Sequence, residues 1–214
     1  MNIEKDIGYY FITDENLSLR GIEEDVKIAC EAGVKIIQYR SKNASSKKMY
    51  EEAYKLRRIC KNYNVKFLVN DRVDIALAVD ADGVHLGQDD MPYPVARKLL
   101  GKKKIIGVST HNINEARIAY FSNVDYIGVG AIYETKTKKG VTKPKGPRII
   151  EEIKKHVDIP IVAIGGINMD NFKDVINAGA NGLCAISDIV SSESMQERIS
   201  IINEEFKNLN KEKK

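Results

Sequence analysis

The chain has 214 residues, of which 43% are hydrophobic and 30% are charged, and its formal net charge is +4. This composition excludes a disordered or fibrous protein and predicts one folded domain; because acidic and basic residues are interspersed, we expect no nucleic-acid partner. No run approaches the roughly 20 apolar residues of a membrane span, and the three cysteines form no C-x-x-C pair, so we expect a cytoplasmic protein without a membrane partner.

Strand-like and helix-like segments alternate along the whole chain. Short β-branched or aromatic runs predict strands buried on both faces at residues 7–13, 34–39, 65–69, 83–86, 105–109, 124–130, 159–165 and 182–187. Helical spacing predicts helices at residues 21–33, 45–64, 72–81, 92–101, 112–122, 147–156, 169–180 and 194–209.

Eight such units predict an α/β fold, a single-domain (β/α)8 TIM barrel, over residues 1–210. Residues 211–214 are expected to form a frayed, charged tail. An open doubly wound sheet is the structural alternative.

Unusual polar residues and glycines collect where the predicted strands end. In a (β/α)8 barrel the carboxyl ends of the strands meet at one rim, which is where active sites form. We therefore expect one site there, built from Gln38, Arg40, Lys42, Asn70, Asp71, Asp89, Asp90, Ser109, residues 133–140, Gly165, Gly166 and Ser187.

Asp71 and Asp90 follow neighbouring strands, which lie only about 4.8 Å apart. Their carboxylates can therefore meet on one hard cation, and Mg²⁺ takes one or two carboxylates and fills its other positions with water and phosphate oxygens. The sequence offers no His/Cys cluster of the kind that zinc prefers. The alternative is that Asp89 and Asp90 cap the helix that begins near Pro92.

Two loops indicate a phosphorylated ligand. The segments "AIGGIN" (163–168) and "AISDI" (185–189) follow the last two strands, where barrels often hold a phosphate on backbone amides and a helix N-terminus. Basic residues on the same rim suit a second, more highly charged phosphate group; they are Arg40, Lys42, Lys136 and Lys138. The pattern predicts two phosphorylated ligands, or one large one.

At these residues the chain resembles the thiamine-phosphate synthase family over nearly its whole length. The motifs that carry the resemblance are "QYRSK" (38–42), "VNDRVDIALAVDADGVHLGQDDMP" (69–92), "GVSTHN" (107–112), "GVGAIYETKTKKG" (128–140), "PIVAIGGI" (160–167) and "AISDI" (185–189). The resemblance implies a transferase that joins 4-amino-2-methyl-5-(diphosphooxymethyl)pyrimidine to a thiazole phosphate, giving thiamine phosphate and pyrophosphate.

The resemblance also implies a role for each matching residue. Gln38 would contact the pyrimidine, and Asp71 and Asp90 would bind Mg²⁺. The diphosphate would lie among Arg40, Lys42, Asn70, Ser109 and Lys138. All of these except Asn70 are the expected catalytic residues. The thiazole phosphate would lie among Thr135, Thr137, Gly166, Ile186 and Ser187. The chain departs from the family pattern at Ser41, where an acidic residue is usual, and at Ala131 and Glu134, where proline is frequent.

The mechanism follows from the electronic structure of the pyrimidine. Its amino group donates electron density toward the exocyclic carbon, so loss of pyrophosphate leaves a cation that the thiazole nitrogen captures. We expect Mg²⁺ and the basic residues to stabilise the departing pyrophosphate, and the loop after the sixth strand to act as a lid that excludes water. The expected partners are these small-molecule substrates, and a homo-oligomer is left open.

Two alternatives remain at this stage. A thiazole tautomerase would share the barrel and the thiazole-phosphate pocket, need no Mg²⁺, and use His111 to move a proton, although a role at the start of a helix is as plausible for His111. A non-enzymatic phosphate-binding or RNA-binding protein is the other class, but the sequence has no aromatic stacking platform. His85 is expected to be a hydrogen-bonded structural residue.

Overall fold

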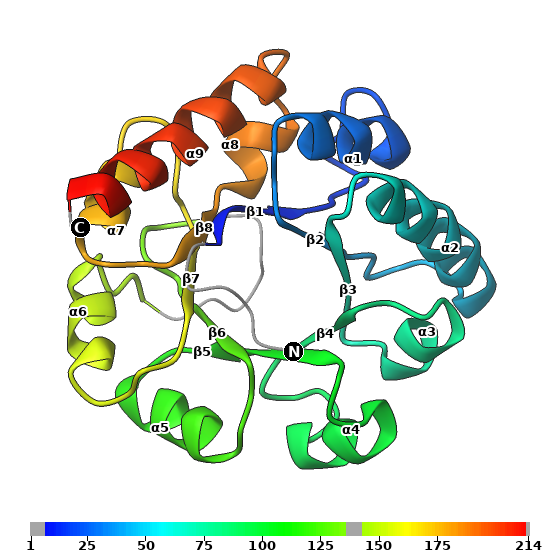
Figure 1. Cartoon of the computed structure of the whole chain (residues 1–214), viewed down its shortest axis with the longest axis horizontal. Helices are drawn as coiled ribbons and strands as arrows, with labels where there is room; N and C mark the ends of the chain where they lie inside the picture. The colour runs from blue at the N-terminus through cyan, green and yellow to red at the C-terminus, as the bar shows by residue number, and fades with distance from the viewer. Residues whose placement is uncertain (1–6, 136–142, 213–214) are drawn as a thin grey trace.

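The structure is a computed structural model that describes residues 7–135 and 143–212. Within these residues, eight parallel strands close into a barrel in chain order (Figure 1). The predicted (β/α)8 barrel is confirmed, and the closure of β8 on β1 excludes an open sheet. The strands are β1 (Gly8–Ile12), β2 (Ile36–Tyr39), β3 (Lys66–Asn70), β4 (Gly83–Leu86), β5 (Ile105–Thr110), β6 (Tyr126–Val129), β7 (Ile161–Ile164) and β8 (Gly182–Cys184).

Helices follow the strands and cover the outside of the barrel (Figure 1). Two of the described helices begin at a capping side chain: Ser45 and Asn112 each accept a hydrogen bond from the backbone amide three residues further on. The described helices are α1 (Ile22–Glu31), α2 (Ser46–Asn62), α3 (Val73–Ala78), α4 (Tyr93–Leu100), α5 (Ile113–Phe121), α6 (Arg148–Lys154), α7 (Phe172–Asn177), α8 (Ile186–Val190) and α9 (Met195–Glu212).

The end of the barrel differs from the prediction. A strand is expected at residues 182–187, but β8 ends at Cys184 and the short helix α8 follows. The described ladder between β1 and β8 ends at Leu183, so a longer strand would leave backbone groups without partners. Asp188 lies in the first turn of α8, where a carboxylate interacts favourably with the helix dipole. Ser187 is therefore a helix residue and does not end a strand.

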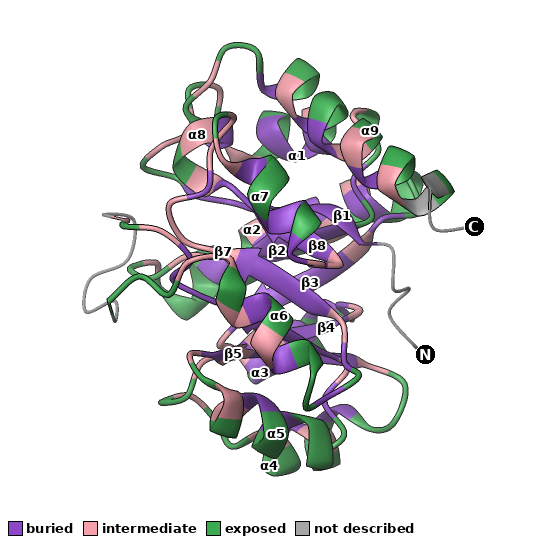
Figure 2. Cartoon of the chain, turned by 90° about the vertical axis from the view of Figure 1, so that its left-hand side faces the viewer, coloured by how far each residue is buried: buried purple, intermediate pink, exposed green. Residues whose placement is uncertain are grey.

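Alternation along the strands creates two packed layers. Tyr9 and Phe11 of β1 pack with the helices, whereas Tyr10 and Ile12 point into the barrel and pack with Tyr126 of β6. Figure 2 shows that the strands are buried and that the exposed residues lie on the outer faces of the helices and on the loops. The barrel interior is therefore filled by side chains.

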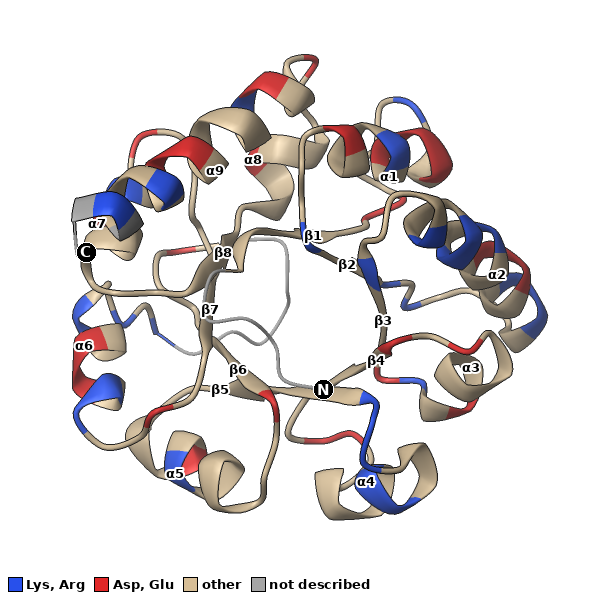
Figure 3. Ribbon diagram, viewed as in Figure 1, with Lys and Arg blue, Asp and Glu red and all other residues tan. Residues whose placement is uncertain are grey.

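Charged residues lie mainly on the outer surface. Basic and acidic residues are interspersed on α1, α2, α6 and α9 (Figure 3), in agreement with the small net charge of +4. None of the described helices combines the length and the apolar character that a membrane span requires. The three cysteines are buried and carry free thiols, so they are core residues.

Candidate active site

A cavity of about 190 Å³ opens at the carboxyl ends of the strands, where the site is predicted. Two of the predicted contact residues, Thr137 and Lys138, lie outside the described residues. So do Lys136 and part of the loop after the sixth strand, which is the expected lid. The cavity is lined by every other predicted substrate-binding or metal-binding residue: Gln38, Arg40, Lys42, Asn70, Asp71, Asp90, Ser109, Thr135, Gly166, Ile186 and Ser187.

A tight turn at the end of β3 places Asp71. The Asp71 amide donates to the carbonyl oxygen of His85 on β4 over 2.9 Å, and the Arg72 amide donates back to the carbonyl oxygen of Asn70 over 2.7 Å. Asp71 adopts a left-handed backbone conformation with φ of 62°, which aspartate and asparagine tolerate better than most residues. The turn leaves the Asp71 side chain against the cavity instead of continuing the strand.

Asp90 lies beside Asp71. Its Oδ2 accepts the Gly87 amide over 2.7 Å, and burial together with the Asp71 carboxylate raises the pKa of Asp90 above its ordinary value. Two adjacent carboxylates disfavour double ionisation unless a cation lies between them. The expected alternative, that Asp89 and Asp90 cap the helix that begins near Pro92, is wrong, because Pro92 is the N-cap of α4 and no side chain caps the helix.

The donor set therefore fits Mg²⁺. Within residues 7–135 and 143–212, no group of three or more His, Cys, Asp or Glu residues is arranged to hold a metal ion. A pair of carboxylates is sufficient for Mg²⁺, which keeps several water or phosphate ligands, but it is not sufficient for a structural zinc site.

Two basic side chains that line the cavity are paired with carboxylates. The Lys42 Nζ is 2.5 Å from Asp71 Oδ2, and one guanidinium nitrogen of Arg40 is 3.6 Å from Asp14 Oδ2. In the described part of the chain the side-chain amide nitrogen of Asn70 is buried and has no hydrogen-bond partner. Because a buried donor without a partner is unfavourable, Asn70 is suited to an anionic acceptor in the cavity.

The opposite side of the cavity is built from the loops after β6 and β7. Gly165 and Gly166 have φ of 102° and 65°, and a Cβ on Gly166 would lie 2.3 Å from the carbonyl oxygen of Glu134. These glycines are required mainly because the β7 loop packs directly on the β6 loop, where the Tyr133 amide donates to the Gly165 carbonyl over 2.9 Å. Beside them, Ser187 lies in the first turn of α8, whose amides have no acceptor within the helix.

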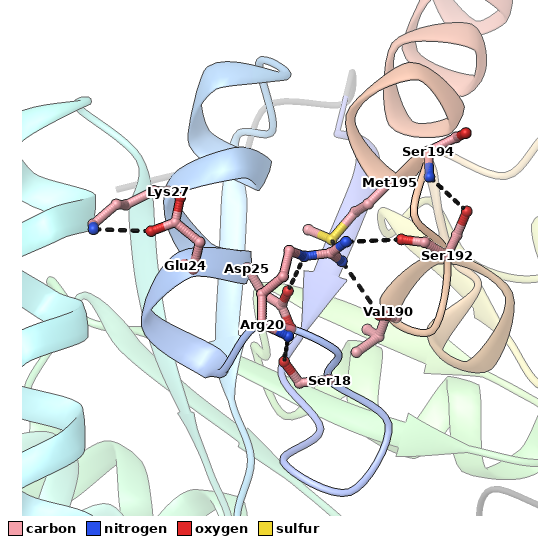
Figure 4. A network of polar contacts seen from close by, with 9 residues as sticks. All are labelled: Ser18, Arg20, Glu24, Asp25, Lys27, Val190, Ser192, Ser194 and Met195. Carbon is pink, nitrogen blue, oxygen red and sulfur yellow. Dashed lines mark hydrogen bonds and ion pairs between the residues drawn. The ribbon is translucent and has the colours of Figure 1, made fainter.

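Helix α8 is held from the α1 side by Arg20 (Figure 4). The guanidinium of Arg20 donates to Asp25 Oδ1 over 3.1 Å and to the carbonyl oxygens of Ser192 over 3.0 Å and Val190 over 3.5 Å. The Asp25 side chain is only 1% exposed, so this ion pair is largely withdrawn from water. The contact fixes the C-terminal end of α8 and with it the position of Ser187.

His111 has the role of a residue at the start of a helix. It precedes Asn112, the N-cap of α5, and its backbone amide and ring Nδ1 lie 2.8 and 2.9 Å from Glu115 Oε2. The imidazole also lines the cavity. The Glu115 carboxylate holds the ring in place, as the helix-start interpretation of the sequence expects.

The structure adds functional candidates that the sequence prediction does not include. Tyr10 and Tyr126 line the bottom of the cavity and are hydrogen-bonded to each other, and His85 bonds to Tyr126. Two glycines within the strands could have indicated these residues from the sequence. A Cβ on Gly107 would lie 2.0 Å from the Tyr126 ring, and a Cβ on Gly128 would lie 3.0 Å from the His85 ring. Glycine inside a strand marks such a close approach of a neighbouring side chain.

The chain is similar to known proteins over most of its length. A family model described as thiamine monophosphate synthase matches residues 9–189. A thiamine-phosphate synthase of Methanosarcina barkeri is 50% identical over 192 residues, which cover 90% of this chain and 87% of the relative. A thiamine-phosphate synthase of Clostridium botulinum is 43% identical over 206 residues, which cover 96% of each protein.

The same relationship is found among solved structures. The thiamine phosphate pyrophosphorylase from Pyrococcus furiosus superposes with a TM-score of 0.87 at 37% sequence identity, and the match covers 96% of this chain and 98% of that chain. The extent of the family match and the identity to these relatives lead to one assignment. The chain belongs to the thiamine monophosphate synthase family.

Proposed function

We propose that this thiamine-phosphate synthase acts by Mg²⁺-assisted, dissociative loss of pyrophosphate. Its substrates would be 4-amino-2-methyl-5-(diphosphooxymethyl)pyrimidine and a thiazole phosphate. The observation that carries the proposal is the single cavity in which paired carboxylates, two cations, a buried amide donor and a helix N-terminus converge. Such a set suits two phosphorylated substrates better than one neutral ligand.

The carboxylate pair would serve the leaving group. Asp71 and Asp90 would hold Mg²⁺, which, when bound, would neutralise part of the negative charge that develops on the departing pyrophosphate. The raised pKa of Asp90 supports this role, because the ionised pair is costly without a cation. Neither carboxylate is needed as a nucleophile.

Basic and polar side chains would complete the pyrophosphate site. Lys42 would exchange its ion pair with Asp71 for a phosphate oxygen, while Arg40, the Asn70 amide and the Ser109 hydroxyl would add donors from neighbouring strands. Groups already in place before the charge develops need little reorganisation during the reaction. Lys138 remains a proposed member of this set.

The thiazole phosphate would bind on the opposite side. The first-turn amides of α8 carry the positive end of the helix dipole, and Ser187 and Thr135 contribute hydroxyl groups. Gly166 lies against the same space. This placement would direct the thiazole ring toward the carbon that loses pyrophosphate, so that its nitrogen can capture the cation.

A coupled assay tests the proposal. Purified protein is mixed with both substrates, with Mg²⁺ or with EDTA, and thiamine phosphate is measured by fluorescence after oxidation while pyrophosphate is measured separately. We expect both products in equal amounts and only with Mg²⁺. Product formation that is unchanged in EDTA would refute the metal assignment, and pyrophosphate release without coupling would show that the cation is captured by water.

A further inference from the structure

Five polar side chains from five strands form a continuous hydrogen-bonded chain across the floor of the cavity. The Gln38 amide nitrogen donates to the Tyr10 hydroxyl over 2.9 Å, and the Tyr10 and Tyr126 hydroxyls are 2.7 Å apart. His85 Nδ1 is 2.8 Å from the Tyr126 hydroxyl, and His85 Nε2 is 3.0 Å from Ser109 Oγ. The chain therefore connects β2, β1, β6, β4 and β5 in that order.

This row of hydrogen bonds has one direction of donation, because each phenol has a single hydrogen to donate. Tyr10 accepts from the amide of Gln38. If Tyr126 also donated to Tyr10, the hydrogen of the buried Tyr10 hydroxyl would have no acceptor in this hydrogen-bonded chain, so the favoured arrangement has Tyr10 donate to Tyr126. Tyr126 then donates to Nδ1 of His85, which leaves the imidazole proton on Nε2. That proton is donated to the oxygen of Ser109, whose own hydroxyl hydrogen is then directed away from the chain and toward the cavity.

The barrel interior fixes this arrangement. Tyr10 and Tyr126 are fully buried, and their ring centroids are 5.8 Å apart. The Tyr126 ring occupies the space beside Gly107, where any Cβ would clash with it. Burial raises the pKa of both phenols, so each keeps the one hydrogen on which the direction of the chain depends.

We propose that Tyr126 and His85 are positioning residues that transmit one hydrogen-bond direction from Gln38 to Ser109 and hold the Ser109 hydroxyl as a donor to the diphosphate. Diphosphate oxygens only accept hydrogen bonds, so Ser109 contributes to the leaving-group site only in this direction. The proposal rests on the proposed function, in which Ser109 contacts the diphosphate. The hydrogen-bonded row would connect Gln38, the proposed pyrimidine contact, to Ser109, which would assist the departure of pyrophosphate.

The first test determines which ring nitrogen of His85 is protonated, and it does not depend on enzymatic activity. Long-range ¹H–¹⁵N NMR of the labelled full chain at neutral pH should show His85 protonated at Nε2. His111 is an internal reference of the opposite kind, because its Nδ1 is 2.9 Å from the Glu115 carboxylate, which can only accept. A His85→Gln variant identifies the His85 signals. His85 protonated at Nδ1, or at both nitrogens, would overturn the proposal.

The second test breaks the chain at its middle. Tyr126→Phe keeps the ring but removes the hydroxyl, and it should convert the His85 spectrum from a single tautomer to a mixture. We expect kcat to fall roughly 10–100-fold, as for a misplaced catalytic group, with KM changed less than about 3-fold. Tyr10→Phe should act in the same direction, whereas Tyr120→Phe, an exposed tyrosine of α5, should change nothing.

A double-mutant cycle separates positioning from general loss of structure. If Tyr126 acts through Ser109, then Tyr126→Phe should cause no further loss of kcat in a Ser109→Ala background. Losses that multiply, or a wild-type kcat in Tyr126→Phe, would overturn the proposal. If the wild-type protein formed no thiamine phosphate, the proposed function would fail, while the NMR experiment would still decide the direction of the chain.

Discussion

At the scale of single residues, the charge of the proposed metal site rests on two carboxylates and one lysine. Asp71 sits in a left-handed turn, pairs with Lys42 and lies beside Asp90. Both carboxylates line the cavity and neither belongs to the hydrophobic core. Removing one carboxylate should therefore affect the reaction much more than the fold.

Asp71→Asn tests this directly. Asparagine tolerates the left-handed conformation and has the same shape, so we expect the melting temperature to change little. The loss of one charged metal ligand should reduce kcat by about 100-fold or more at saturating Mg²⁺. Asp89→Asn is the matched control, because Asp89 is exposed and does not line the cavity, and it should keep full activity. Equal activity of the two variants would contradict the metal assignment.

Asp90, unlike Asp71, should lower the stability of the fold when it is ionised. Burial and Asp71 raise its pKa, so the folded protein binds this proton more tightly than the unfolded chain. Ionised Asp90 therefore lowers the free energy of unfolding above its pKa, and this cost disappears as the pH falls. In EDTA, Asp90→Asn should melt at a higher temperature than the wild type at pH about 7, with a smaller difference at pH about 4. A lower melting temperature at neutral pH would contradict this cause of the pKa shift.

At the scale of elements, the short helix α8 depends on a contact outside the cavity. Arg20 connects α1 to the end of α8 through the buried carboxylate of Asp25 and two backbone carbonyls. A helix of this length has few internal hydrogen bonds, so its position must come from its neighbours. The Ser187 side of the cavity is thus stabilised by residues far from it in sequence.

Arg20→Ala should reveal this dependence. The substitution leaves the nearly inaccessible Asp25 without its cation, and we expect the free energy of unfolding to fall by roughly 3 kcal/mol. In the folded variant, KM for the thiazole phosphate should rise more than KM for the pyrimidine diphosphate. Lys27→Ala removes the neighbouring exposed ion pair with Glu24 (Figure 4) and serves as the control, with no measurable change. Urea unfolding and steady-state kinetics check both expectations.

At the scale of the whole molecule, the barrel is predictable because its strands are buried on both faces. Such strands appear in the sequence as continuous apolar runs, so the number and order of the strands follow from the sequence. The longer helices between them have regular spacing, but the short helix α8 is not predicted. The rim residues are predictable as well, since polar groups at strand ends are unusual in a core. The resemblance then supplies their chemistry.

The remaining features depend on contacts between distant segments. Tyr10 and Tyr126 have the pattern of ordinary strand residues until the register places their hydroxyls 2.7 Å apart. The start of α8 depends on where the ladder with β1 ends, and the left-handed turn at Asp71 depends on a bond to the β4 backbone. None of these follows from local propensity, because each is decided by a neighbour in space.

The whole molecule should also respond to its ligands. The pyrophosphate site joins residues of several strands, so a ligand that binds the folded chain alone stabilises the entire barrel. Mg²⁺ and pyrophosphate together should act more than additively, because the cation neutralises Asp71 and Asp90 while the anion takes Lys42 and Arg40. At about 100 times the dissociation constant the gain is roughly 2.7 kcal/mol.

For a chain of this size that gain corresponds to an increase of about 5–10 °C in melting temperature. Differential scanning fluorimetry with each ligand alone and with both measures the increase. The joint effect should disappear in Asp71→Asn, which removes the cation site, and remain in Asp89→Asn, which changes the net charge equally. An undiminished joint shift in Asp71→Asn would show that pyrophosphate binds the basic residues without the carboxylate pair, and the two halves of the proposed site would then be independent.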